Sequence, residues 1–309
     1  MEKFQKLYEQ FRKERKEEIL TPNGLLIVAD MSDRLTIGKH TFGTHSSNSI
    51  VLDSERLPSA LDFMGTLIVD KMWRVTYHAH PGNKHIDAWH EDHHHSTPGN
   101  KFRANTVKLK HPDVFVYPAP NIHFKLAFVS KPDHYVLLFW DDQNPRVLAL
   151  NKERYLPCYP FDKSWILNGH FKPDPGYGTG GVVEFRLPWD ATRKIHTLFT
   201  TGPIVRPGLV VIGFMDHTTS APGGTFYGGR VLVAKVAGFE DRRKSKADCT
   251  CEGKCNGIRV ELDFNVAFNP MCAFTPFWPM VLPYKTNILP FEVKAGEKNP
   301  PHLGEPNWE

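Results

Sequence analysis

Apolar and polar residues alternate along most of the chain, and this pattern predicts short β-strands. Residues 260–268 show it clearly, with apolar side chains at the even positions and Glu261, Asp263, Asn265 and Ala267 between them. A period of two residues is typical of a half-buried strand, so we expect a strand through Phe268. Similar runs, separated by turn residues, extend from Gly24 to about Leu150 and continue after Tyr155.

The first segment departs from this pattern. Phe4, Leu7, Tyr8 and Phe11 recur at helical spacing, which predicts an amphipathic helix over residues 1–22. We therefore expect an all-β protein that begins with one helix. A β-sandwich should occupy residues 23–150, with a His-rich insertion from Pro81 to Asn105 forming a surface loop, and a second antiparallel β domain should occupy residues 151–309.

Composition narrows the class of protein. The 309 residues are 40% hydrophobic and 23% charged, as in a globular protein, and Lys plus Arg exceed Asp plus Glu by only four (38 against 34). Such a small excess gives no reason to expect nucleic-acid binding. The charged N-terminus does not resemble a secretory signal, and no long apolar run follows. We therefore expect a cytoplasmic protein without a membrane partner.

The segment FMDHTTSAPGGTFYGGRVL, residues 214–232, concentrates polar chemistry around a turn. An apolar strand ends at Asp216, and Pro222-Gly223-Gly224 should reverse the chain toward Arg230. Carboxylate, imidazole, phenol and guanidinium groups would then meet, which suits acid–base catalysis or an anionic ligand. The alternative is a buried ion pair between Asp216 or Asp263 and Arg230 that stabilises the sheet.

A second polar group follows the strand at residues 260–268. Asp263, Asn265 and Asn269 should share one face and line a pocket, unless the carboxamides only cap backbone groups. Cys272 is either a nucleophile or an inert core thiol. The catalytic candidates are Asp216, His217, Asp263 and Cys272, and the ligand-binding candidates are Thr218, Tyr227, Arg230, Asn265 and Asn269.

Two clusters have metal-ligating side chains. Cys249, Cys251 and Cys255 offer three thiolates within seven residues, for which zinc is the expected occupant. The His-rich insertion offers imidazoles at His90, His93 and His94. The alternatives are reduced thiols on a loop and a surface tract that binds no metal in the cell.

The chain resembles, nearly end to end, the family called domain of unknown function 1684. The resemblance is carried by RYLPCYPFD, FMDHTTSAPGGTFYGGRVL, LDFNVAFNPMCAFTP, Asn287 and Ala295-Gly296-Glu297. It implies no activity, but it places these candidates at family positions: Asp216, Thr218, Tyr227, Arg230, Asp263, Asn265, Asn269 and Cys272. The segment TFGTHSSNSIVL also resembles a forkhead-associated sandwich, whose Arg and Ser hold a phosphothreonine. Thr44 stands where that Arg is expected and Asp62 where a His is usual.

These features support three hypotheses about function. The first is a small polar or anionic ligand bound in the C-terminal domain, with acid–base chemistry of a hydrolase kind. The second is a non-enzymatic interaction module, in which the sandwich binds a protein partner and the Arg and Asp residues are structural. The third is a metal-dependent protein. The common dinucleotide, phosphate-loop, zinc-protease and serine-hydrolase motifs are absent.

Overall fold

The structure, a computed structural model, divides into two compact units. It describes residues 2–20, 28–83, 87–91, 98–103, 105–109, 114–130, 133–145, 156–173, 180–200, 208–236, 258–277, 280 and 282–300. The residues of unit 1 fall within 1–14, 153–274 and 280–301, and those of unit 2 fall within 15–152 and 275–279. Most of residues 153–301 therefore belong to unit 1.

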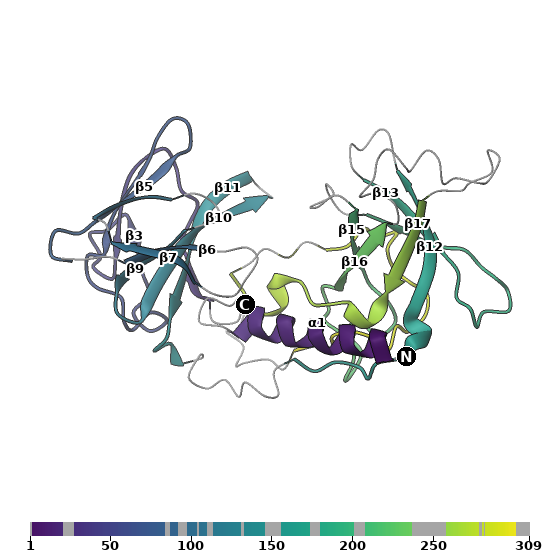
Figure 1. Cartoon of the computed structure of the whole chain (residues 1–309). Coiled ribbons are helices and arrows are strands. Elements are labelled where there is room, and N and C mark those ends of the chain that lie inside the picture. The colour runs from purple at the N-terminus through teal and green to yellow at the C-terminus, as the bar shows by residue number, and fades with distance from the viewer. Residues whose placement is uncertain are drawn as a thin grey trace. The chain divides into compact units, whose positions relative to one another are not determined.

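The predicted helix is present as α1, Glu2–Leu20 (Figure 1). Tyr8 and Phe11 anchor it to unit 1, where their rings lie 5.5 Å from Phe161 and 6.4 Å from Phe268. The Tyr8 hydroxyl also donates a 2.9 Å hydrogen bond to the Tyr159 carbonyl. Burial of this phenol raises its pKa. A helix as rich in charge as this one depends on such packing for its stability.

Unit 2 is a sandwich of two β-sheets. One has the strand order β1-β11-β10-β9-β6-β7 and the other β3-β2-β4-β5-β8. Their apolar faces enclose one core, in which Phe42 lies 5.2 Å from Phe124 and 5.8 Å from Tyr77. The strands are β1 Val28–Met31, β2 Gly38–Gly43, β3 Ile50–Val51, β4 Gly65–Val69, β5 Val75–Ala79, β6 Asp87–Glu91, β7 Pro98–Arg103, β8 Thr106–Leu109, β9 Val114–Ala119, β10 Ile122–Ser130 and β11 Asp133–Asp141.

Unit 1 is built on a single six-stranded antiparallel sheet. Its order is β14-β13-β12-β17-β16-β15, and its inward side chains form a second, separate core. The strands are β12 Ile166–Pro173, β13 Gly181–Phe185, β14 His196–Phe199, β15 Leu209–Phe214, β16 Arg230–Val236 and β17 Ile258–Asp263, and the short 3-10 turns are η2 Lys163–Trp165, η4 Phe264–Val266 and η5 Met271–Ala273.

Asn287 joins the two edge strands of this sheet. Its amide nitrogen donates 2.7 Å hydrogen bonds to the carbonyls of Phe199 in β14 and Gly213 in β15. Its carbonyl oxygen accepts a 2.7 Å bond from the Phe199 N–H. The side chain is fully buried, and its hydrogen bonds take the place of direct strand pairing between β14 and β15. The sheet of unit 1 is thereby nearly closed into a barrel.

The predicted all-β fold with an N-terminal helix is confirmed. Two local predictions were wrong. The His-rich segment contains strands β6 and β7, which pair with each other and extend a sheet through β9. Strand β17 ends at Asp263 rather than Phe268, because the Asp263 carboxylate caps the 3-10 turn that follows. Among the described residues, no helix has both the length and the apolar character needed to cross a bilayer.

Candidate functional site

The hairpin of β15 and β16 brings Asp216 and Arg230 together. Phe214 and Arg230 are paired residues across the two strands, and Asp216 lies just beyond the end of β15. The guanidinium Nη2 donates a 2.7 Å hydrogen bond to Asp216 Oδ2. The pair is an ion pair with neither side chain accessible, at 1% and 0% exposure.

The remaining contacts of Arg230 are also internal. Nη2 donates a 3.0 Å bond to the carbonyl of Val293, and Nη1 donates to the carbonyl of Ala295. The guanidinium carbon lies 5.1 Å from the centre of the Phe214 ring. Burial lowers the pKa of Arg230, while the adjacent Asp216 opposes that shift. The arrangement stabilises a charge inside the fold rather than presenting it to solvent.

Asp216 organises the loop that follows it. Its Oδ1 accepts bonds from the N–H of Thr218 at 2.7 Å and from the N–H of Val293 at 3.2 Å. The buried hydroxyl of Thr218 lies 3.1 Å from that of Thr225. Asp216, Thr218 and Arg230 therefore converge as predicted, but in a buried network that connects the 216–230 hairpin to residues 293–295.

The second polar group lies in a different network. Asp263 Oδ1 accepts bonds from the backbone and side-chain nitrogens of Asn265, at 3.0 and 2.9 Å. The Asn265 carboxamide pairs with both backbone groups of Asp162, at 2.9 and 3.0 Å. Burial raises the pKa of Asp263. Within the described part of the chain, no hydrogen bond or ion pair joins Asp263 to Arg230.

Asn269 belongs to a third set of contacts. Its N–H donates a 2.7 Å bond to Glu297 Oε2, and its side chain donates a 2.8 Å bond to the carbonyl of Lys298. Both Asn269 and Glu297 are buried. Glu297 and Asn287 were not predicted from the sequence as network residues. The signal for both is their position in the family resemblance, C-terminal to the strand predicted at residues 260–268.

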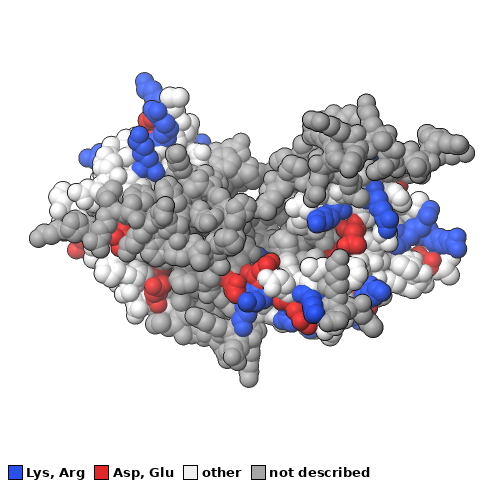
Figure 2. Space-filling model, viewed as in Figure 1, with Lys and Arg blue, Asp and Glu red and all other residues white. Residues whose placement is uncertain are grey.

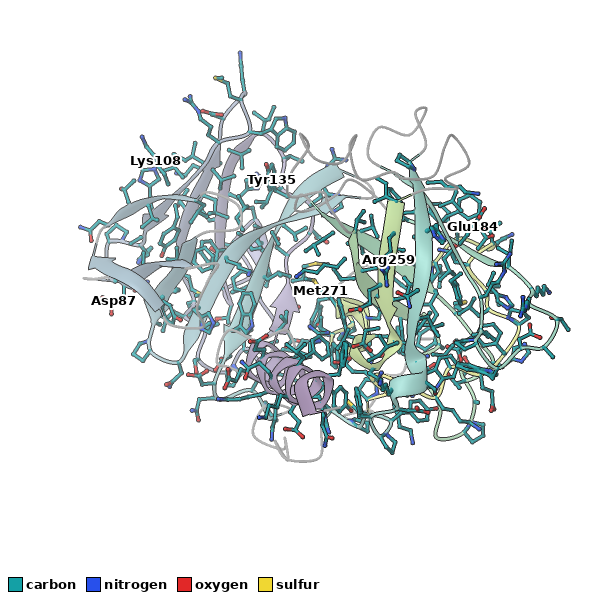
Figure 3. All side chains as sticks on the ribbon, turned by 45° about the vertical axis from the view of Figure 1, so that its right-hand side comes forward. Asp87, Lys108, Tyr135, Glu184, Arg259 and Met271 are labelled. Atoms are coloured by element: carbon teal, nitrogen blue, oxygen red, sulfur yellow. The ribbon has the colours of Figure 1, made fainter. Side chains whose placement is uncertain are left out.

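The other candidates are accessible to differing degrees. His217 is exposed, and Tyr227 is 51% exposed with its ring 4.4 Å from that of Phe226. Cys272 is half-buried in η5. Figure 3 shows the neighbouring Met271 on the same turn. Unit 1 thus brings Asp216 and Arg230 together in its interior and leaves an imidazole and a phenol at its surface.

The metal candidates fall mostly outside the described residues. Cys249, Cys251, Cys255, His93 and His94 all lie there, and only the backbone of His90 is described, in β6. In the described part of the chain, no three His, Cys, Asp or Glu side chains converge as metal ligands.

In the sandwich, the positions compared with a phosphothreonine site contact each other. The Thr44 hydroxyl donates a 2.9 Å hydrogen bond to Asp62 Oδ1. A carboxylate at this point repels a phosphate group, so this pair lacks the electrostatics of phosphopeptide recognition.

In a comparison with protein families, one family model is similar to the second half of the chain. Residues 152–298 match DUF1684, a family of proteins of unknown function. The match covers about half of the chain, so the predicted near-full-length resemblance to DUF1684 was too broad. No curated protein matches the chain.

A solved structure is also similar to this chain. It is the solution NMR structure of an uncharacterised protein of Haloarcula marismortui, which is 19% identical. The likeness covers 48% of this chain and 78% of that protein, with a TM-score of 0.34. A TM-score this low supports no conclusion about function.

Proposed function

We propose that the protein is a non-enzymatic interaction module in which the DUF1684 unit is held by a structural Arg–Asp network and the sandwich supplies the binding surface. The burial of Arg230 carries this proposal. A guanidinium at 1% exposure, with its observed donors directed at Asp216 and two backbone carbonyls, has no accessible face for an incoming anion.

The scaffold of the sandwich is proposed to be forkhead-associated-like without phosphothreonine recognition. Two facing sheets of six and five strands are compatible with such a scaffold. The Thr44–Asp62 contact favours a different class of partner, because the pair carries no cation to hold a phosphate. We accordingly assign the partner to a protein or other surface rather than to a phosphorylated peptide.

Substitution of Arg230 tests the structural role. Arg230→Met should lower the free energy of unfolding by roughly 3–5 kcal/mol, because it leaves the buried Asp216 carboxylate without its counter-charge. The double variant Arg230→Met/Asp216→Asn should recover part of that loss, since the amide oxygen can still accept from Thr218 and Val293. Urea unfolding measures both.

Arg259→Met is the matched control, because Arg259 is exposed on β17 and bonds only to Asn168 among the residues described (Figure 3). Its cost should stay below about 0.5 kcal/mol. An Arg230→Met protein as stable as this control would contradict the structural role.

A small polar ligand in unit 1 is the second candidate. Arg230 Nε is buried and has no hydrogen-bond partner in the described part of the chain, which leaves one donor for an enclosed small molecule. Native mass spectrometry of the purified protein distinguishes the interaction module from a protein that binds a small polar ligand. The interaction-module proposal expects the mass of the chain alone, and a retained small molecule lost in Arg230→Met would favour the second candidate.

A further inference from the structure

The turn between β4 and β5 presents apolar side chains where turns usually have small polar ones. It comprises residues 70–74, Asp-Lys-Met-Trp-Arg, and we call it the tip. Met72 is 73% exposed, more than any other large hydrophobic side chain in the described part of the chain. Trp73 follows at 38% exposure. Gly, Asn, Asp and Ser are the usual residues of such turns. The Trp73 ring packs 6.4 Å from the ring of Tyr135, but this contact leaves part of the indole exposed and does not explain Met72.

The tip is held in one defined conformation. Asp70 Oδ1 accepts hydrogen bonds from the N–H groups of Met72 at 2.8 Å and Arg74 at 2.9 Å. The carboxylate also pairs with Arg74 Nε at 2.6 Å. Trp73 has a φ of +58°, a left-handed conformation that a bulky side chain rarely adopts. Backbone strain of this kind gathers at functional positions, which prompts a functional explanation for the indole.

Two lysines lie near the tip on the outer face of its sheet. Ile68 in β4 is exposed and pairs with Lys39 in β2 and Thr76 in β5, and Thr76 pairs with Lys108 in β8. Lys39 and Lys108 are both exposed. With Ile68 and Thr76 they form a row across four strands. One residue on β4 and one on β5 separate this row from the tip.

The tip adds Lys71 and Arg74 to these cations. Of the residues in the tip and the row, Asp70 alone is acidic, and its charge is paired with Arg74. Figure 2 shows Lys and Arg side chains gathered at the upper end of this unit, and Figure 3 shows Lys108 on it. The tip and the row together are therefore apolar at the turn and net positive.

We propose that this end of the sandwich docks on an anionic lipid surface, with Met72 and Trp73 at the boundary between headgroups and acyl chains. Trp is favoured at that depth, and Lys and Arg are attracted to anionic headgroups. The order of the groups supports a membrane rather than an acidic protein surface. Met72 and Trp73 lie in the turn itself, and Lys39 and Lys108 lie further along the sheet. This order fits a bilayer interface, where apolar side chains enter the boundary with the acyl chains and cations remain among the headgroups.

Such docking is peripheral, so it needs no spanning helix. We expected no membrane partner because the sequence has no spanning segment. A turn can also form a membrane-binding surface, without such a segment. The inference concerns the sandwich alone. It therefore stands or falls independently of the structural role of Arg230 in unit 1.

Vesicle flotation tests the proposal with the full chain. The wild-type protein should float with vesicles of phosphatidylcholine and phosphatidylglycerol in equal parts, and should remain behind with phosphatidylcholine alone. Lys71→Glu should weaken binding to the anionic vesicles by about fivefold or more, because each cation near such a surface contributes about that factor. High salt should weaken binding further.

Trp73→Gly separates docking from folding. Glycine adopts a positive φ without strain, but the variant loses the packing of the indole on the Tyr135 ring, so it should stay folded with a somewhat lower unfolding temperature. It should nevertheless bind anionic vesicles about tenfold more weakly, since the interfacial indole is gone. The matched control is Trp189→Gly in unit 1, where the indole is 50% exposed, and this variant should bind like the wild type.

Three results would overturn the proposal. The first is a wild-type protein that does not float with anionic vesicles, and the second is one that floats equally well with neutral vesicles. The third is a folded Trp73→Gly variant that binds as tightly as the wild type or no more weakly than Trp189→Gly.

Discussion

His123 lies between two aromatic rings in unit 2. Its imidazole stacks on Tyr117 at 4.6 Å and on Trp140 at 5.2 Å. Lys125 approaches the Trp140 ring at 5.7 Å. Burial, assisted by Lys125, lowers the pKa of His123 from 6.5 to about 3. The folded protein therefore holds this imidazole neutral, whereas the unfolded chain binds a proton below pH 6.5.

This difference predicts loss of stability in acid. The stabilisation from neutral His123 is complete above the unfolded pKa and is lost as the pH falls from about 6.5 toward 3. At pH 5 the loss relative to pH 8 should be about 2 kcal/mol. His123→Phe keeps an aromatic ring in the stack and should remove this contribution. Urea unfolding at a series of pH values measures the difference between the two proteins.

His170→Phe is the control for that experiment, because His170 is exposed on β12. This variant should follow the wild-type pH dependence. If His123→Phe lost stability in acid as steeply as the wild type, the neutral buried imidazole would not be the cause.

At the residue scale, the sequence predicted which polar residues meet across a hairpin. It did not predict which distant backbone groups they contact. Asp216 and Arg230 were expected to meet because a turn separates two adjacent strands, and they do. Asn265 was expected to line a pocket, yet it pairs with the backbone of Asp162, more than a hundred residues earlier. Alternation places a side chain on a face. It does not reveal which distant segment covers that face.

At the scale of elements, adjacent glycines in the Pro222-Gly223-Gly224 turn have different physical roles. Gly223 has a φ of +66° with open space where a Cβ would lie. Gly224 does not have a left-handed φ, but a Cβ there would collide with the carbonyl of Thr218 and lie 2.9 Å from that of Ala221. The turn thus needs one glycine for conformation and one for close approach.

Alanine at each position separates these two roles. Gly223→Ala should cost about 1 kcal/mol, because only the left-handed backbone conformation is strained. Gly224→Ala should cost more, roughly 2–3 kcal/mol, since the backbone of the hairpin must shift to relieve the collision. Urea unfolding of the two variants compares them directly. Equal costs, or a larger cost at Gly223, would contradict this assignment.

Most strands could be predicted from the local alternation of apolar and polar residues. The exceptions depend on pairing between segments that are far apart in the sequence. The alternating runs of β13 through β16 become strands because each has one apolar face toward the unit 1 core. The His-rich segment carries no such signal, yet β6 is paired on both sides by β7 and β9. Asn287 likewise contributes a single side chain that replaces strand pairing at the seam of β14 and β15. Such backbone complementarity does not appear in residue periodicity.

At the scale of the whole molecule, the two units have separate hydrophobic cores. One is formed by side chains such as Phe42 and Phe124 in unit 2, and the other by side chains such as Phe171 and Phe264 in unit 1. From the runs of strands in the sequence, a boundary is predicted between residues 150 and 151. The assignment of residues 275–277 to unit 2, within a segment otherwise in unit 1, could not be predicted from the sequence. It depends on tertiary contacts rather than on local sequence.

Separate cores predict two unfolding transitions that respond to different changes. Arg230→Met should lower the temperature of one transition and leave the other within about 1 °C, because all observed partners of Arg230 belong to unit 1. His123→Phe should alter the acid dependence of the other transition alone, since His123 and its ring contacts belong to unit 2. Calorimetry of the two variants at pH 7 and pH 5 measures both effects. A single transition that moves as one in both variants would show that the cores unfold cooperatively, and would require coupling stronger than separate cores provide.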